Sequence, residues 1–486
     1  MSEGQGGHPG CFGGFQELRR RFSFRRHVNG SNTQGQASDA HSDPRGPDIF
    51  GKENSLEPDM HFASCCDFSS SPIDRVLSQS QSPPPYNEKA GWYQDVFRVL
   101  ETRMDELSPL LRKLSLQIHD HPELMFEERY ARDVLTAFMA DQGFQVTQNY
   151  LGLETAWRAE WTKGTGGRVL GINSEMDALP RIGHACGHNL IAIAGVGVAL
   201  AVKSILEAQD IQGKIVLLGT PGEEGGGGKA ILLERGGYDD MDICMMCHPS
   251  SGAPSTSSII PSLAMQALEV EFFGHTAHAS AAPWEGVNAL DAAFLAYSSV
   301  AVLRQQIKPD HRVHGVVTGA ELVANVIPDY TKMRWYVRAP TKRELEVLRD
   351  RVTACFDAAA LATGCGIKIS AAQPYYELRQ NTVLSQEFAD NMQRYGFTTT
   401  VSHSSPASTD FGNVSFSVPS IHPAFGITTE PNGGNHTPAF TAAARTTRAH
   451  DTCITIVKGL ALTGFRALDD DDFYEEVRLA WSSPQS

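Results

Sequence analysis

A cysteine and a histidine two residues apart, Cys186 and His188, are the side chains of this sequence whose types and spacing most suggest chemistry. They lie in EMDALPRIGHACGHN, from Glu175 to Asn189, directly after an apolar run. Side chains two residues apart do not share a helix face, which needs a spacing of three or four. In a tight loop, however, a thiolate and an imidazole so placed can bind one metal ion. Alone, the segment fits a glycine-rich turn with a structural cysteine equally well.

Further donor side chains stand at the ends of other predicted elements. They are Glu224 after the apolar strand 214–219, His248 after the apolar strand 241–247, and His436 before a predicted helix. Because ligands in open α/β sheets gather beyond the carboxyl ends of the strands, we expect these donors to meet Cys186 and His188 there. The adjacent carboxylates Glu223 and Glu224 are costly to hold together unless a cation neutralises them. Five donors exceed the needs of one four-coordinate zinc ion, which favours a two-metal centre.

The elements that must position these residues alternate between short apolar strands and helices. This order predicts a mostly parallel sheet sandwiched by helices, in a first part over residues 91–263 and a second part over 375–468. The helix expected over 190–206 is apolar, with Gly195 and Gly197 allowing close packing on the sheet. Residues 264–374 change to the order β-α-β-β-α-β, which predicts an inserted ferredoxin-like domain.

Composition limits the kinds of partner and the compartment. The 486 residues carry a formal net charge of −15, which argues against nucleic acid or an anionic membrane as the main partner. We expect no segment long and apolar enough to span a bilayer. Nine cysteines, an odd number, favour reduced thiols and a cytoplasmic location.

Both ends of the chain differ from its centre. Residues 1–90 are rich in Gly, Ser and Pro and are expected to be disordered, because they lack an apolar period. Within them, Pro83–Tyr86 (PPPY) fits either a ligand of a WW-domain protein or an ordinary proline-rich linker, the second being favoured for so short a motif. Residues 469–486 are expected to form an acidic, solvated tail.

The ordered motifs of the chain resemble those of a metallopeptidase and amidohydrolase family that contains aminoacylases, hippurate hydrolases and indole-acetyl-amino acid hydrolases. The resemblance covers about residues 94–465 and is carried by HDHPELMFEE (119–128), EMDALPRIGHACGHN (175–189), PGEE (221–224), CHP (247–249), GHTAHASAAPWEGVNALDA (274–292), NVIPD (325–329), STDFGNVS (408–415) and NHTPAF (435–440). Asn189 and the STDFGNVS run are most similar to the Xaa-Arg, or β-alanyl-lysine, dipeptidase subgroup. Many relatives have Asp in place of Asn189 and Ala in place of Gly222, which bears on the substrate and not on the chemistry.

The resemblance implies roles for individual residues. It implies that Cys186, His188, Glu224, His248 and His436 are metal ligands. The donor types themselves favour one or two Zn²⁺ ions, because thiolate and imidazole suit zinc, while the carboxylate also admits Mn²⁺ or Co²⁺. The resemblance also implies that Glu223 is the general base for a metal-activated water. Two neighbouring carboxylates suit this division of work, because one can bind metal while the other, raised in pKa, moves protons.

The remaining implied roles concern residues around the ligands. Asp177 would orient a ligand, although a loop or capping role is the alternative. His278 of the inserted domain would polarise the scissile carbonyl across a homodimer formed through that domain, which would also act as a lid. Asn325 would join His278 in an oxyanion-type role, with an ordinary turn asparagine as the alternative.

Two enzymatic substrates and one non-enzymatic function follow from this interpretation. The resemblance favours hydrolysis of a dipeptide with a basic C-terminal residue, and the alternative is an N-acyl amino acid as substrate. Arg334 and Arg338 alternate on a predicted strand, so that either could bind a substrate carboxylate. A catalytically silent scaffold that binds WW domains is the distant alternative, disfavoured because the ligand-type residues and Glu223 are all present.

Overall fold

The structure is a computed structural model, and it describes residues 75–76, 90–318, 322–402 and 407–483. The Pro83–Tyr86 motif lies outside the described residues, as does most of the 1–90 region predicted to be disordered.

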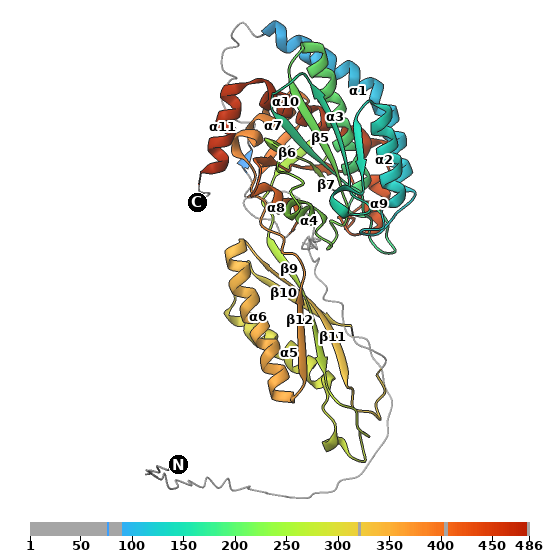
Figure 1. Cartoon of the computed structure of the whole chain (residues 1–486), viewed down its shortest axis with the longest axis vertical. Helices are drawn as coiled ribbons and strands as arrows, with labels where there is room; N and C mark the ends of the chain where they lie inside the picture. The colour runs from blue at the N-terminus through green and yellow to red at the C-terminus, as the bar shows by residue number, and fades with distance from the viewer. Residues whose placement is uncertain (1–74, 77–89, 319–321, 403–406, 484–486) are drawn as a thin grey trace, which may run out of the picture. The chain divides into compact units, whose positions relative to one another are not determined.

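A six-stranded sheet holds the two strands that lead into Asp177 and into Glu223 (Figure 1). In order across the sheet its strands are β14 (Ser420–Ile421), β6 (Ile243–Met245), β4 (Val169–Glu175), β5 (Gly213–Thr220), β3 (Trp157–Lys163) and β2 (Gln145–Gln148). The first four run parallel, and β3 and β2 are antiparallel to their neighbours. Strands β4 and β5 are buried, which explains the apolar runs 169–172 and 215–218 within them. The predicted α/β class with a mostly parallel sheet is confirmed.

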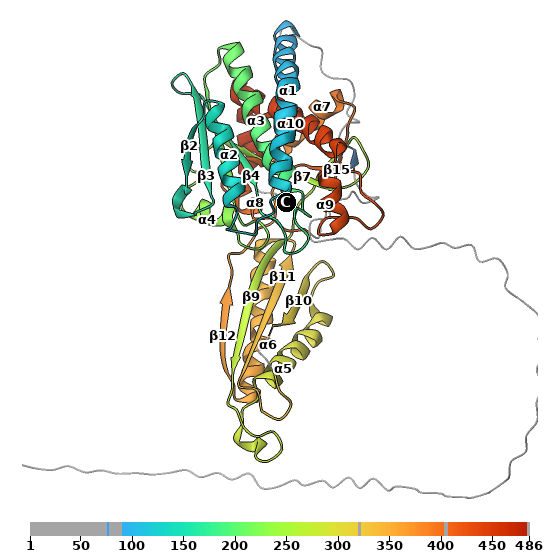
Figure 2. The same cartoon turned by 90° about the vertical axis from the view of Figure 1, so that its right-hand side faces the viewer.

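Long helices pack against this sheet. Helix α3 (His188–Gln209) contacts β4, β5, α1 (Ala90–His119) and α10 (Thr447–Asp469). Figure 2 shows α3 beside α1 and α10. Further helices of this part include α2 (Arg129–Asp141), α4 (Gly228–Glu234), α7 (Thr382–Arg394), α8 (Phe411–Ser415) and α9 (Pro438–Ala444). Contrary to expectation, α3 is long and apolar enough to cross a membrane, but 89% of its most apolar window is buried inside the protein. Its composition is therefore explained by its place in the core.

A second sheet changes the position expected for His248. Its strands, in order, are β1 (Arg75–Val76), β13 (Thr398–Val401), β8 (Thr256–Ile259), β15 (Ala424–Ile427) and β7 (His248–Ser251). The predicted strand 241–247 is wrong, because β6 ends at Met245 and the chain then enters the second sheet. His248 is the first residue of β7, not the residue after a strand.

Residues 264–371 form an antiparallel sheet of four strands with two helices. In chain order the elements are β9 (Ala264–Phe273), α5 (Ala289–Leu303), β10 (Arg312–Val317), β11 (Tyr330–Ala339), α6 (Lys342–Thr363) and β12 (Gly366–Ala371). The strand order β10–β11–β9–β12 is that of a ferredoxin-like unit. Both helices cover one face of the sheet, where Trp335 and Phe356 are fully buried (Figure 1). The alternate residues of β11, including Arg334, lie on the other face and are partly exposed.

The acidic end of the chain differs from the solvated tail expected over residues 469–486. It forms helix α11 (Asp471–Ser482), whose Phe473 and Val477 are buried against the core. The Asp470 side chain caps the helix by accepting a hydrogen bond from the Phe473 backbone N–H, and Asp471 and Asp472 lie in the first turn. The acidic run is thus favourable for a helix N-terminus, which carries a partial positive charge.

Candidate metal centre

A glycine in the left-handed conformation lets Cys186 and His188 lie together. Gly187 has a φ of 78°, and a Cβ atom there would lie only 2.5 Å from Cγ of Pro249. His188 is the first residue of α3, and Cys186 lies in the preceding loop. The Cys186 Sγ atom lies 3.3 Å from Nε2 of His248, which begins the neighbouring β7. The turn at Gly187 and the position of His248 at the start of β7 therefore bring one thiol and two imidazoles close together.

Asp177 joins two of the predicted site segments. Its carboxylate lies 3.1 Å from Nδ1 of His188 and accepts hydrogen bonds from the backbone N–H groups of Glu223 (3.2 Å) and Glu224 (2.9 Å). Asp177 is completely buried. Burial alone would raise its pKa, but the His188 ring and the backbone donors outweigh burial and lower it. The structure thus gives Asp177 a contact with His188, as the orienting role expects, and two contacts with the backbone of the acidic turn, as the loop or capping role expects.

Glu224 and His436 meet near Cys186. Their Oε1 and Nε2 atoms are 3.0 Å apart. His436 has a φ of 67°, which is strained for a residue with a side chain. Its backbone N–H donates to the carbonyl oxygen of Ala185 at 2.8 Å, so this conformation is tied to the loop that carries Cys186. Strained backbone held by such contacts is common where side chains must be aimed.

The five candidate ligands form two groups that share Cys186. One consists of Cys186, His188 and His248 and the other of Cys186, Glu224 and His436, and in each group one ligand atom from every residue lies within 4.8 Å of the others. A thiolate, imidazole nitrogens and a carboxylate are the donor set of zinc and similar ions. The arrangement suits two ions that share one ligand.

The electrostatics of this centre also fit a cation. Nε2 of the fully buried His188 has no hydrogen-bond partner among the described residues, and this nitrogen faces Glu175 and Glu223 at 3.4 and 3.9 Å. Burial alone would lower the pKa of His188, but Asp177, Glu175 and Glu224 outweigh it and raise that pKa to about 10. The carboxylates therefore favour positive charge here, which either a proton or a metal ion can supply.

The side chain proposed as base lies beside this centre. Burial, together with the nearby Glu175 and Glu224 carboxylates, raises the pKa of Glu223 well above its usual range. The Tyr375 hydroxyl donates to the Glu223 backbone carbonyl at 2.8 Å. Glu223 therefore has a raised pKa and a main chain fixed on both of its peptide groups, as a proton carrier requires.

His278 and Asn325 lie next to each other in the inserted domain. The backbone N–H of Ala279 donates to the Asn325 carbonyl oxygen at 3.0 Å. Nδ1 of His278 accepts from the backbone N–H groups of Ser280 (3.3 Å) and Ala281 (3.2 Å), so a neutral ring carries its proton on Nε2. Within the described part of the chain, no hydrogen bond links either side chain to the five candidate ligands. The structure therefore pairs these residues with each other and not with the metal centre.

Several buried residues around the centre were not identified from the sequence. Lys229, Glu175 and Asp410 form an ion-paired cluster that spans 235 residues of chain, so no local pattern could reveal it. Gly222, which has a φ of +69°, packs against the Phe126 ring, and a Cβ atom there would lie 2.8 Å from Cζ of that ring. The Glu128 carboxylate accepts from the Gly222 backbone N–H at 2.9 Å. Glu128, Glu175, Gly222 and Asp410 belong to motifs that the sequence shows, but their contacts could not be predicted from it.

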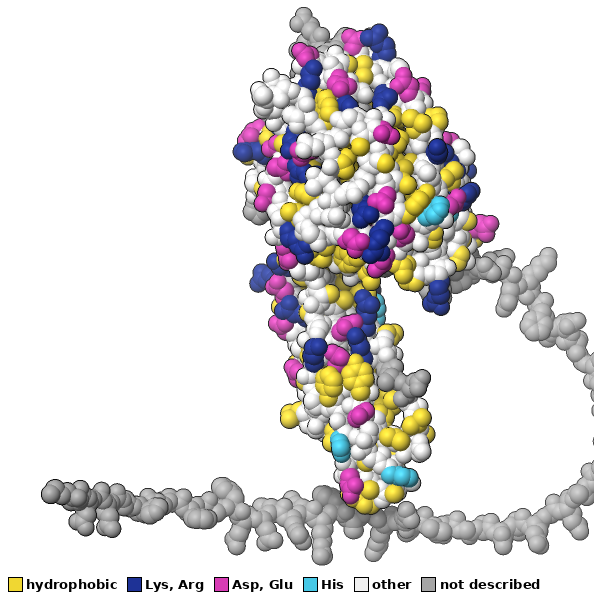
Figure 3. Space-filling view, turned by 45° about the vertical axis from the view of Figure 1, so that its right-hand side comes forward, with side chains coloured by type: hydrophobic (Ala, Val, Ile, Leu, Met, Phe, Trp, Pro, Cys, Tyr) yellow, Lys and Arg dark blue, Asp and Glu magenta, His cyan; other side chains and the backbone are white. Residues whose placement is uncertain are grey.

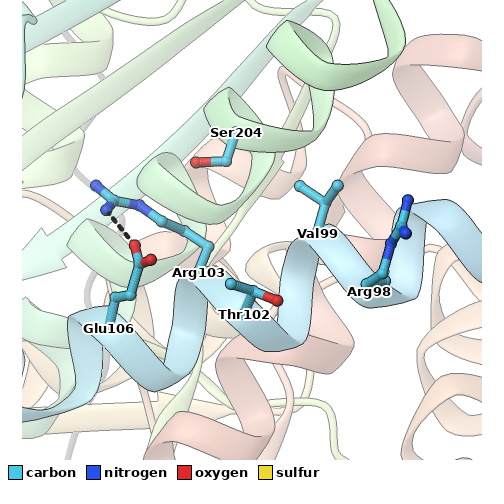
Figure 4. Close-up of a pocket in the computed structure, with 6 residues that line it drawn as sticks. All are labelled: Arg98, Val99, Thr102, Arg103, Glu106 and Ser204. Carbon is cyan, nitrogen blue, oxygen red and sulfur yellow. Dashed lines mark hydrogen bonds and ion pairs between the residues drawn. The ribbon is translucent and has the colours of Figure 1, made fainter.

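A surface hollow also lies far from this centre. Figure 4 shows its lining residues, which are Arg98, Val99, Thr102, Arg103, Glu106 and Ser204. Ser204 follows His188 by 16 residues on α3, which is roughly 24 Å at the rise of a helix. Elsewhere, the face in Figure 3 carries acidic and basic side chains interspersed, which does not suit a long anionic partner on that face.

The fold and the donor set are those of a metal-dependent hydrolase, and the chain belongs to peptidase family M20/M25/M40, whose model matches residues 171–460. It is 42% identical to an Xaa-Arg dipeptidase of Mus musculus over 77% of this chain and 90% of that protein. It is 31% identical to one of the subunits of the p-aminobenzoyl-glutamate hydrolase of Escherichia coli, over 56% of this chain and 59% of that protein. A crystal structure of a dinuclear metal-binding M20 peptidase from Bacillus subtilis superposes with a TM-score of 0.55 at 18% identity, covering 75% of this chain and 99% of that one.

Proposed function

We propose that this hydrolase cleaves the amide bond of dipeptides with a basic C-terminal residue, of the Xaa-Arg or β-alanyl-lysine type. The observation that carries the chemistry is the turn that holds Glu223 and Glu224 together beside Cys186, His188, His248 and His436. Similarity to the mouse Xaa-Arg dipeptidase over 90% of its length supports the substrate class. We further propose a cytoplasmic location for the enzyme.

We propose Zn²⁺ as the resident ion, one or two per chain, held by Cys186, His188, Glu224, His248 and His436, with Mn²⁺ or Co²⁺ able to replace it. When bound, the ions supply Lewis-acid activation of water and of the scissile carbonyl. Glu223 accepts the proton of the attacking water and then delivers it to the departing amine nitrogen, so that the base is regenerated. Asp177 holds His188 in one orientation through its contact with Nδ1.

The inserted domain supplies the remaining groups. The neutral His278 ring has its proton on Nε2, so it can donate to the developing oxyanion with Asn325 beside it. His278 lies beyond the far end of β9, and the ten residues of that strand span roughly 30 Å. This length favours the contribution of His278 to a second chain, in a homodimer formed through the inserted domain.

A substrate carboxylate needs a cation, and Arg334 is the better of the two arginines considered. Its Nη2 lies 3.9 Å from the position of a Cβ on Gly225, directly after the Glu223–Glu224 pair. Nε of Arg334 is buried and has no hydrogen-bond partner in the described part of the chain. Arg338, in contrast, donates to the Ser408 hydroxyl at 2.9 Å. We therefore assign the carboxylate contact to Arg334.

The test compares amine release from β-alanyl-lysine and Ala-Arg with release from N-acetyl and N-benzoyl amino acids, using zinc-reconstituted protein and Glu223→Gln. The proposal expects preference for the basic dipeptides and loss of nearly all activity in the variant with metal still bound. Preference for acylated amino acids would instead support the alternative, an N-acyl-amino acid amidohydrolase, which the similarity to the E. coli p-aminobenzoyl-glutamate hydrolase favours. No release from either group of substrates would overturn the proposal.

A further inference from the structure

Lys229 is a buried ammonium group for which the proposed reaction has no use. Its Nζ lies 2.6 Å from Oε1 of Glu175 and 2.5 Å from Oδ1 of Asp410, and all three side chains are fully buried. A buried ammonium is costly unless opposite charges compensate it, and here two carboxylates do so. Burial alone would lower the pKa of Lys229, but Asp410 and Glu175 outweigh it and raise that pKa. The two carboxylates therefore favour the charged form of Lys229.

The backbone of Lys229 is held by the same carboxylate as its side chain. Lys229 is the second residue of α4, and its N–H donates to Oδ2 of Asp410 at 2.8 Å. Only four glycines separate Lys229 from Glu224. A run of glycines imposes little conformation of its own, so the end of this loop needs an external anchor. Asp410 provides it at both the main chain and the side chain of one residue.

The cluster also borders the metal centre. Oε2 of Glu175, on the side away from Lys229, lies 3.4 Å from Nε2 of His188. One oxygen from each of Glu175, Glu223 and Asp410 lies within 4.8 Å of the other two. The described structure records ion pairs of Lys229 with Glu175 and Asp410 but none with Glu223. Lys229 thus forms ion pairs with two of three crowded carboxylates, and the third, Glu223, is the proposed base.

We propose that Lys229 is a positioning residue for the hydrolysis, acting through Glu175 and Asp410. It is the internal cation that fixes the end of the loop after Glu223 and keeps the Glu175 carboxylate in place beside Glu223. Lys229 itself touches neither substrate nor ligand. This inference rests on the proposed function, because it assumes that Glu223 is the base.

The test replaces Lys229 by methionine, which has a similar volume and no charge. Lys214→Met is the matched control, because Lys214 also lies between two carboxylates, Asp240 at 3.1 Å and Glu160 at 3.4 Å. Lys214 is near the start of β5, six residues or roughly 20 Å from the end of the strand that leads to Glu223. Each protein is loaded with zinc, and its metal content, kcat and KM are measured.

For Lys229→Met we expect kcat to fall about 100-fold, because a base displaced by about 1 Å loses a factor of this size. KM should stay within about threefold and the metal content should be unchanged, since neither substrate nor ligands contact Lys229. Lys214→Met should keep kcat and KM within about threefold. A change in KM without a change in kcat would overturn the proposal.

The single variant leaves buried carboxylates uncompensated, so a double variant guards against a simple failure to fold. Lys229→Met with Asp410→Asn removes one cation and one anion from the same pair. We expect this protein to fold and bind metal like the wild type, with kcat still about 100-fold lower, because the loop has lost its charged anchor. Recovery of kcat to within threefold would show that Lys229 is only structural, and reduced metal content would show that it acts on the ligands; either result overturns the proposal.

Failure of the proposed function would look different. If Glu223→Gln kept its activity, the base would be wrong whatever the Lys229 variants did. If Glu223→Gln were inactive and Lys229→Met fully active, the proposed reaction would stand and the role of Lys229 would fall.

Discussion

Replacing Asp177 by asparagine removes one oxygen from a side chain that has three polar neighbours. Oδ1 lies 3.1 Å from Nδ1 of His188 and accepts from the Glu223 N–H, and Oδ2 accepts from the Glu224 N–H at 2.9 Å. Asparagine is nearly the same size, but its amide nitrogen must face one of these donors. At least one buried donor then loses its acceptor, and His188 loses a charged neighbour.

The size of the effect follows from these contacts. A buried donor without a partner costs about 1–3 kcal/mol, and the lost charge-assisted contact adds a similar amount, so Asp177→Asn should destabilise the protein by about 2–6 kcal/mol. Loss of the group that orients a metal-binding histidine typically weakens metal affinity about 10- to 100-fold. Both effects should appear together, because the same carboxylate holds His188 and the acidic turn.

The assay is a zinc titration against a chromophoric chelator, combined with urea unfolding of the zinc-loaded and zinc-free proteins. Asp240→Asn is the control, because Asp240 also accepts several hydrogen bonds, from Arg158 and Lys214, but its side chain is 42% exposed. That variant should lose at most about 1 kcal/mol and keep its zinc affinity. Zinc affinity and stability unchanged in Asp177→Asn would refute the reasoning.

Three other outcomes are expected. Burial, with a smaller effect of Arg112, lowers the pKa of His450 to about 4 in the folded protein. In the unfolded chain this histidine is protonated at a higher pH, near about 6.5. The free energy of unfolding should therefore decrease as pH falls from about 6.5 to 4, by up to about 1.4 kcal/mol per pH unit. Urea unfolding at pH 7.5 and 5.5 should show a smaller loss in His450→Gln, and an equal loss would contradict this. Gly222→Ala must place a Cβ at positive φ against Phe126, so its melting temperature and kcat should both fall, with a cost of about 1–3 kcal/mol; unchanged kcat would mean that the turn tolerates the strain. Asp470→Ala removes the α11 cap and should cost about 1 kcal/mol in urea without changing kcat, whereas an altered kcat would count against a purely structural α11.

The parts of the fold that follow from local sequence were predictable. Strands such as β4 and β5 are apolar because both their faces are buried, and α3 is apolar because it packs between the sheet and two helices. The same patterns fail where an element is defined by its neighbours. The apolar run over 241–247 looks like one strand, but only contacts with β14 and β4 decide that β6 ends at Met245 and that the next strand joins another sheet. Likewise, Phe473 and Val477 are too few to reveal α11 without the core surface that they cover.

In the candidate site, too, the sequence motifs identify some residues, and others are identified only by their contacts in the structure. Residue type and spacing were enough to select Cys186, His188 and Glu224, since thiolates, imidazoles and carboxylates are costly to bury except around a cation; their role as ligands stays a prediction. No spacing could select Lys229, because a lysine after four glycines is an ordinary surface sequence until Asp410, 181 residues later, accepts hydrogen bonds from both its main chain and its side chain. A run of glycines imposes little conformation of its own. The orientation of Glu223 and Glu224 therefore depends on side chains from distant parts of the chain. Sequence motifs therefore indicate which groups can react, whereas the long-range contacts decide how firmly those groups are held.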